Sequence, residues 1–195
     1  MTPHLIQALA AEMYRWDLRW FHAIHPTMAP STTMRLWARG LADGPLLMTA
    51  GLLGWMLVTP RRSLRWLACR VMAVAGVALV VNALVALVWD RPRPFVAGIG
   101  HAWMSHAATG SFPSDHLTLQ WTIAGLLLWD GRTRWWGVVV ALLGLPMAWA
   151  RIYLGVHYPG DMVGALAMAV LVVASCGVVR NRLPAPAEQL RAQVD

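Results

Sequence analysis

Five long apolar segments account for about half of this 195-residue chain. An α-helix needs about 20 apolar residues to cross a bilayer, and the segments approach that length. The mean hydropathy is +0.51 and only 13% of the residues are charged, which excludes an ordinary soluble domain. The sequence therefore predicts an all-α, polytopic membrane bundle, with spanning helices at about 41–59, 64–89, 116–129, 134–150 and 161–179.

The residues at the two ends of the chain complete the predicted layout. Residues 5–25 alternate charged side chains with tryptophan and aliphatic residues, a pattern typical of a helix that lies in the membrane interface. After Arg182 the apolar character ends, and a stretch with proline, alanine and glutamine predicts a solvated tail over 183–195. Residues 1–182 are therefore expected to form a single membrane-embedded domain.

Arginine supplies all sixteen basic side chains, and the net charge is +7. The arginines occur in short clusters between the apolar segments instead of on one continuous face, which argues against nucleic-acid binding. One cluster follows the first apolar segment, one follows the third and one follows the last. Arginine clusters of this kind favour the cytoplasmic side of the membrane. The connections at about 90–115 and 151–160 are then expected to face outward.

The segment that begins at Arg151 and ends at Asp161 carries the most chemistry. Pro159 and Gly160 predict that one helix ends before His157 and that another begins near Asp161. A carboxylate in that first turn can bond one ring nitrogen of His157 and fix its tautomer, which leaves the other nitrogen as a nucleophile. Taken alone, the same pattern also suits a helix cap and an interfacial histidine.

A second motif, Phe112-Pro-Ser114-Asp115-His116, opens the third apolar segment. The backbone N–H groups and the positive end of the dipole at the start of a helix favour an anion. His116 can donate a proton to a leaving oxygen, and Ser114 can donate a hydrogen bond to a phosphoryl oxygen. Helix capping by Ser114 or Asp115 is compatible with these roles.

A third motif contains Arg91 and Arg93, each followed by a proline that ends the preceding helix and keeps the backbone extended. A guanidinium group binds phosphate oxygens in pairs and stays charged at any working pH. Arginines at the end of a spanning helix are also common as headgroup anchors. Arg91 and Arg93 are therefore candidate phosphate ligands.

Together, Arg-Pro, Pro-Ser-x-His and Arg-x5-His-x3-Asp resemble the motifs of the type 2 phosphatidic acid phosphatase superfamily, over about residues 80–165. The resemblance implies that His157 is the nucleophile, that Asp161 orients it and that His116 is the general acid and base. It also implies phosphate binding by Arg93 and Arg151 with help from Ser114, and it calls for no metal or cofactor.

Two positions depart from the family pattern. Ala86 stands where the family usually has a lysine, and Ala150 stands where a serine usually precedes the arginine of the last motif. One phosphate contact could therefore be absent. Asn82 or Arg91 could take the place of the lysine.

Finer features look like the bacitracin-resistance type of undecaprenyl-diphosphate phosphatase, namely Arg-Pro-Arg-Pro-Phe, Phe-Pro-Ser-Asp-His and a short loop with His101 and His106. This likeness implies an enzyme of the bacterial inner membrane whose active site faces the periplasm or the cell exterior. Its substrate would be a polyprenyl diphosphate, hydrolysed through a phosphohistidine to recycle the carrier lipid of peptidoglycan synthesis. His101 and His106 could contact the diphosphate, bind a metal or be solvated.

Other functions remain open at the level of the sequence. The motifs recognise phosphate, so the substrate could be phosphatidic acid, phosphatidylglycerol phosphate or lipid A, and the phosphoryl group could pass to a second lipid. The chain could also bind a phospholipid without catalysis. The sequence carries no signal for an oligomeric state.

Overall fold

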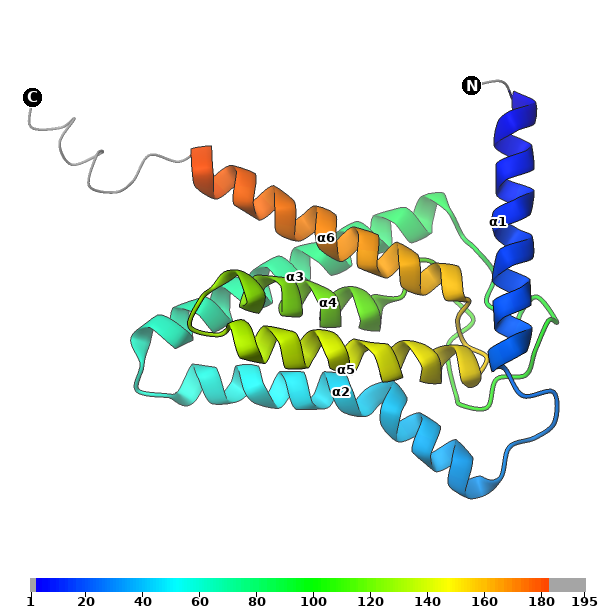
Figure 1. Cartoon of the computed structure of the whole chain (residues 1–195), viewed down its shortest axis with the longest axis horizontal. Helices are drawn as coiled ribbons and strands as arrows, with labels where there is room; N and C mark the ends of the chain where they lie inside the picture. The colour runs from blue at the N-terminus through cyan, green and yellow to red at the C-terminus, as the bar shows by residue number, and fades with distance from the viewer. Residues whose placement is uncertain (1–2, 183–195) are drawn as a thin grey trace, which may run out of the picture.

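The computed structural model describes residues 3–182, which form six α-helices and no strand within that range. Helices α2 to α6 form an elongated bundle, and α1 lies across one end of it (Figure 1). The predicted all-α membrane bundle is confirmed, whereas the predicted tail at 183–195 lies outside the described residues. The helices are α1 (Pro3–Ile24), α2 (Thr32–Val58), α3 (Arg62–Val88), α4 (Asp115–Trp129), α5 (Arg134–Tyr153) and α6 (Pro159–Arg182).

The five predicted spans correspond to α2 to α6, and the largest difference is at the start of α2. This helix begins at Thr32 and not at about 41, because residues 32–40 include arginines that lower the hydropathy but favour helix formation. Ser31 caps the helix, and its hydroxyl oxygen accepts a hydrogen bond from the Met34 N–H at 3.2 Å.

Four of the helices, α2, α3, α5 and the part of α6 up to Gly177, are long and apolar enough to cross a membrane. The remaining bundle helix, α4, has 15 residues and is therefore about 22 Å long, shorter than the roughly 30 Å hydrocarbon core of a bilayer. It is nevertheless the central helix, because it packs against α2, α3, α5 and α6. The chain is a multi-pass membrane protein.

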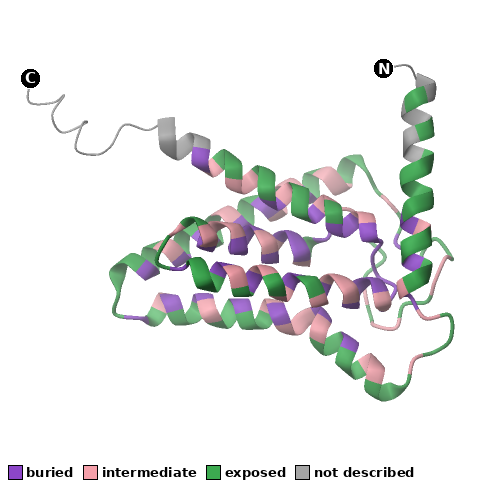
Figure 2. Cartoon of the chain, viewed as in Figure 1, coloured by how far each residue is buried: buried purple, intermediate pink, exposed green. Residues whose placement is uncertain are grey.

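Buried residues run along the inside of the bundle, and exposed residues lie on its outside (Figure 2). Many of the exposed residues are large and apolar. This is the pattern expected where lipid covers the outer face. One core cluster fills the space between α2, α3, α4 and α5 around Met56, Val71 and Leu127. A second cluster includes Phe21 of α1 with Leu117 and Tyr158, so it ties α1 to the bundle.

The α3–α4 loop and the α5–α6 turn lie at the same end of the bundle as α1 (Figure 1). The Trp103 N–H donates to the Leu154 carbonyl at 2.9 Å and joins the two segments. Gly155 has φ +77°, and a Cβ there would lie 2.2 Å from the His101 carbonyl oxygen. Only glycine suits both the conformation and the close approach. The three sequence motifs are therefore collected at one end of the bundle.

Candidate active site

The α5–α6 turn and the first turn of α6 hold a histidine and a carboxylate in direct contact. His157 Nδ1 lies 3.2 Å from Asp161 Oδ2, and the same oxygen accepts a hydrogen bond from the Tyr158 N–H at 2.9 Å. His157 is 2% exposed and Asp161 is fully buried. Because an ionised carboxylate only accepts hydrogen bonds, Nδ1 carries the proton and donates a hydrogen bond to Asp161. The lone pair is then on Nε2.

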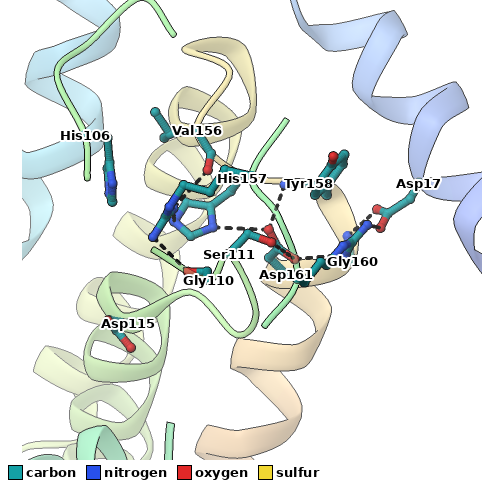
Figure 3. A network of polar contacts seen from close by, with 12 residues as sticks. Asp17, His106, Gly110, Ser111, Asp115, Val156, His157, Tyr158, Gly160 and Asp161 are labelled. Carbon is teal, nitrogen blue, oxygen red and sulfur yellow. Dashed lines mark hydrogen bonds and ion pairs between the residues drawn. The ribbon is translucent and has the colours of Figure 1, made fainter. Parts of the chain in front are cut away.

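Arg93 lies beside that nitrogen. Figure 3 draws His157 together with Asp161. The Nη1 of Arg93 is 3.0 Å from His157 Nε2 and also donates to the Val156 carbonyl at 3.0 Å. Its Nε and Nη2 donate to the carbonyls of Thr109 and Gly110 at 3.0 and 3.1 Å. Since a guanidinium group can only donate, this contact independently assigns the lone pair to Nε2. A phosphoryl group that approached Nε2 would meet the Arg93 cation.

Burial and nearby cations together keep His157 neutral. Burial is the largest cause that lowers the pKa of His157 well below its ordinary value of 6.5, and the charges of Arg93 and Arg151 lower it further. The imidazole is therefore uncharged near neutral pH. Its Nε2 carries the lone pair that accepts the Arg93 hydrogen bond.

Arg151, in the last turn of α5, is fully buried and only partly bonded. Its Nη2 donates to Asp43 Oδ1 at 2.9 Å, whereas its Nε and Nη1 are buried without a partner. The hydroxyl of Ser114, the residue before α4, is also buried without a partner. An unsatisfied buried donor costs about 1–3 kcal/mol, so these groups mark where a ligand with acceptor oxygens would fit.

His116 lies in the first turn of α4 and faces a carboxylate that the sequence analysis did not select. Its Nε2 is 3.9 Å from Asp43 Oδ1, the same oxygen that bonds Arg151. Asp43 belongs to α2, which is bent (Figure 1) and contains Pro45 two residues further on. A carboxylate within an apolar segment is costly and typical of functional sites, and this signal could have identified Asp43.

The two histidines of the α3–α4 loop have different surroundings. The His106 ring lies 5.9 Å from the His157 ring, centre to centre, at 85°. Burial, Arg93 and Arg151 lower the pKa of His106, so it shares the surroundings of His157 and is not simply solvated. The His101 backbone N–H donates to His25 Nε2 at 3.2 Å, and its ring contacts Trp103. Among the described residues, no group of three or more His, Cys, Asp and Glu side chains could hold a metal ion.

Arg91, a candidate phosphate ligand from the sequence, contacts two carboxylates in the structure. Its Nη1 donates to Asp161 Oδ1 at 2.9 Å and its Nη2 to Asp17 Oδ2 at 2.5 Å, and its guanidinium lies 3.9 Å above the Tyr158 ring. It therefore contacts the carboxylate behind the histidine. Asn82 donates to Asp115 Oδ1 and Thr118 Oγ1, each at 3.0 Å. Both side chains considered as replacements for the family lysine thus have carboxylate partners within the protein.

Known proteins are similar in sequence to this chain. The model of the PAP2 superfamily matches residues 66–183. Undecaprenyl-diphosphatase BcrC of Bacillus subtilis (strain 168) is 42% identical over 100 residues, which are 51% of this chain and 51% of that protein. Putative undecaprenyl-diphosphatase YbjG of Escherichia coli (strain K12) is 36% identical over 116 residues, 59% of this chain and 58% of that protein. The chain spans about half the length of the curated relatives it matches.

A solved structure supports the fold. The crystal structure of the first transmembrane PAP2 type phosphatidylglycerolphosphate phosphatase from Bacillus subtilis superposes with a TM-score of 0.68 at 19% identity, and the match covers 92% of this chain and 94% of that one. At this identity the similarity establishes the helical arrangement alone.

Proposed function

We propose a function from one premise: the chain belongs to the PAP2 superfamily. Within that superfamily, we propose that it hydrolyses undecaprenyl diphosphate to undecaprenyl phosphate and inorganic phosphate. The names of the BcrC and YbjG relatives support this substrate. The reaction would regenerate the lipid carrier used in peptidoglycan synthesis, and in this proposal it requires no metal.

The observation that carries the proposal is the combination of a neutral histidine with buried hydrogen-bond donors that have no partner. His157 presents a lone pair on Nε2 while Asp161 holds Nδ1. Arg151 Nε and Nη1 and the Ser114 hydroxyl are buried without partners. A phosphoryl group supplies the acceptor oxygens that these donors lack and the electrophile that the histidine lacks.

In the first half of the proposed reaction, Arg93 and Arg151 hold the distal phosphoryl group and stabilise charge on its equatorial oxygens. His157 Nε2 attacks phosphorus in line, forming an N–P bond as the P–O bond to the lipid breaks. The electron pair of that bond leaves with undecaprenyl phosphate. Asp161 stabilises the imidazolium ring of the phosphohistidine through Nδ1.

In the second half, His116 takes a proton from water, and the resulting hydroxide displaces His157 from phosphorus. The bond to Nε2 breaks, its electron pair returns to the histidine and inorganic phosphate leaves. Asp43, 3.9 Å from His116 Nε2, stabilises the imidazolium that His116 becomes when it takes the proton. In the first half, the leaving lipid phosphate is acidic and needs little protonation.

The proposed location is the bacterial inner membrane, with the site facing the periplasm or cell exterior. The site lies at the end of the bundle that holds the α3–α4 loop and the α5–α6 turn. The opposite end carries Arg61, Arg62 and Arg132, which favour the cytoplasmic side. An outward site suits a substrate that is produced where wall polymers are assembled.

Phosphate release by purified protein with excess chelator tests the proposal. Undecaprenyl diphosphate and phosphatidic acid are compared as substrates, with His157→Ala as the inactive variant and His22→Ala of exposed His22 as the matched control. We expect faster release from the diphosphate, lost in His157→Ala and kept in His22→Ala. Preference for phosphatidic acid would refute undecaprenyl diphosphate as the substrate. Activity in His157→Ala would refute His157 as the nucleophile.

A further inference from the structure

A carboxylate of α1 contacts the turn that carries the nucleophile. Asp17 lies outside residues 66–183, the part of the chain that the superfamily model matches, and it is 4% exposed. Its Oδ1 accepts a hydrogen bond from the Gly160 N–H at 2.6 Å, and its Oδ2 lies 2.5 Å from Arg91 Nη2. Figure 3 draws Asp17 reaching toward Gly160 from a separate helix. In the sequence, Asp17 is one of several charged residues of the predicted interfacial helix.

From Asp17, ionic contacts continue without a gap to the nucleophile. Arg91 Nη1 bonds Asp161 Oδ1 at 2.9 Å, and Asp161 Oδ2 is 3.2 Å from His157 Nδ1. The chain of contacts is thus Asp17, Arg91, Asp161 and His157, which we call the charge relay. The Arg91 side chain is only 13% exposed. Water therefore screens these contacts weakly.

We propose that Asp17 is a positioning residue that acts on His157 through Arg91 and Asp161. The inference rests on the proposed role of His157 as the nucleophile. Arg91 by itself would neutralise Asp161 and weaken its stabilisation of the imidazolium that forms on phosphorylation. Asp17 supplies a second negative charge, so the three groups together keep a net charge of −1 beside His157. In a buried site this net negative charge lowers the energy of the positively charged imidazolium.

Asp17 also fixes the position of the turn. The Gly160 N–H is one of the first N–H groups of α6, which have no partner within the helix, and Asp17 accepts its hydrogen bond. A Cβ at Gly160 would lie 2.7 Å from Asp17 Oδ2, so only glycine permits the approach. The adjacent residue is Asp161. Asp17 therefore holds Asp161 through both its Arg91 partner and its backbone.

The main alternative is that Asp17 only docks α1 on the bundle. Phe21, on the same helix and fully buried, provides the comparison because it packs against Leu117 and Tyr158 without a contact in the charge relay. Phe21→Leu loosens the docking and leaves every charge in place. If docking alone matters, Phe21→Leu and Asp17→Asn will alter the enzyme in the same way.

The experiment measures kcat, KM and melting temperature in lipid nanodiscs, with undecaprenyl diphosphate as substrate. We expect Asp17→Asn to lower kcat about tenfold, the effect of losing one hydrogen bond to a charged group, and to leave KM within about twofold. Phe21→Leu is expected to lower the melting temperature and keep kcat. Wild-type kcat in Asp17→Asn, or equal kcat losses in the two variants, would overturn the inference.

Two further variants keep the test decisive if Asp17→Asn folds poorly. Gly160→Ala preserves every charge but displaces the Asp17 carboxylate, so a similar loss of kcat is expected. The double variant Asp17→Asn/Arg91→Gln should lose less activity than the product of the two single losses, because part of the effect of Asp17 passes through Arg91. Additive losses would overturn the relay. Activity in His157→Ala would instead refute the proposed nucleophile, whatever Asp17 does.

Discussion

Replacing Arg151 by lysine tests whether its unpartnered N–H groups bind phosphate. Arg151→Lys keeps one positive charge in a fully buried position but removes the planar fork. In the free protein only Nη2 has a partner, Asp43 Oδ1 at 2.9 Å, and a lysine ammonium can keep that contact. The free protein should therefore lose little stability.

Binding of the phosphoryl group should be weakened more than the stability of the free protein. In our mechanism Arg151 Nε and Nη1 each donate to a phosphoryl oxygen, and a hydrogen bond to a charged group is worth about 1.5–3 kcal/mol. The lysine can restore one of the two bonds at best. A net loss of about 1.5–3 kcal/mol corresponds to a fall of about 10- to 150-fold in kcat/KM.

The assay is initial-rate phosphate release over a range of undecaprenyl diphosphate concentrations, with the melting temperature measured in parallel. Arg132→Lys is the matched control, because exposed Arg132 lies in the α4–α5 loop and pairs with Asp130. We expect the control to keep wild-type kcat/KM. A value for Arg151→Lys within about threefold of wild type would refute phosphate binding through the fork.

Three other predictions follow from the same geometry. Asp161→Asn should lower kcat by as much as about 10⁴-fold, because the amide no longer fixes the His157 tautomer, and a rate within tenfold of wild type would contradict this role. Asp43→Asn should lower kcat/KM about tenfold by releasing Arg151 and His116, whereas unchanged kinetics would make Asp43 incidental. The pKa of His157 lies well below 6.5, so its neutral form persists on acidification, and a pH–rate profile should show its protonation only at pH values well below 6.5.

The helices were predictable because hydropathy dominates this sequence. Apolar runs located α2 to α6, and only the arginine-containing first part of α2 was assigned too late. The motif order also predicted that His157 and Asp161 would meet, since a carboxylate in the first turn after a proline–glycine pair can reach back to the histidine. The structure brings them to 3.2 Å. Their catalytic roles stay predictions.

Partners from distant helices were not predictable in the same way. Asp17 and Asp43 lie far in sequence from the residues they contact, and no local pattern states which helices will touch. Arg91 illustrates the consequence, because its proximity to Arg93 in sequence suggested a shared phosphate. The structure instead bonds Arg91 to Asp17 and Asp161.

The most direct test of the central claim is the detection of phosphate on His157. Undecaprenyl diphosphate labelled in its distal phosphate is mixed with wild type and with His116→Ala, the reaction is stopped in alkali to preserve phosphohistidine, and the labelled peptide is identified by mass spectrometry. We predict phosphate on His157, at a higher level in His116→Ala because hydrolysis of the intermediate is slowed. Label on another residue, or unlabelled protein in both samples while wild type releases phosphate, would contradict the account.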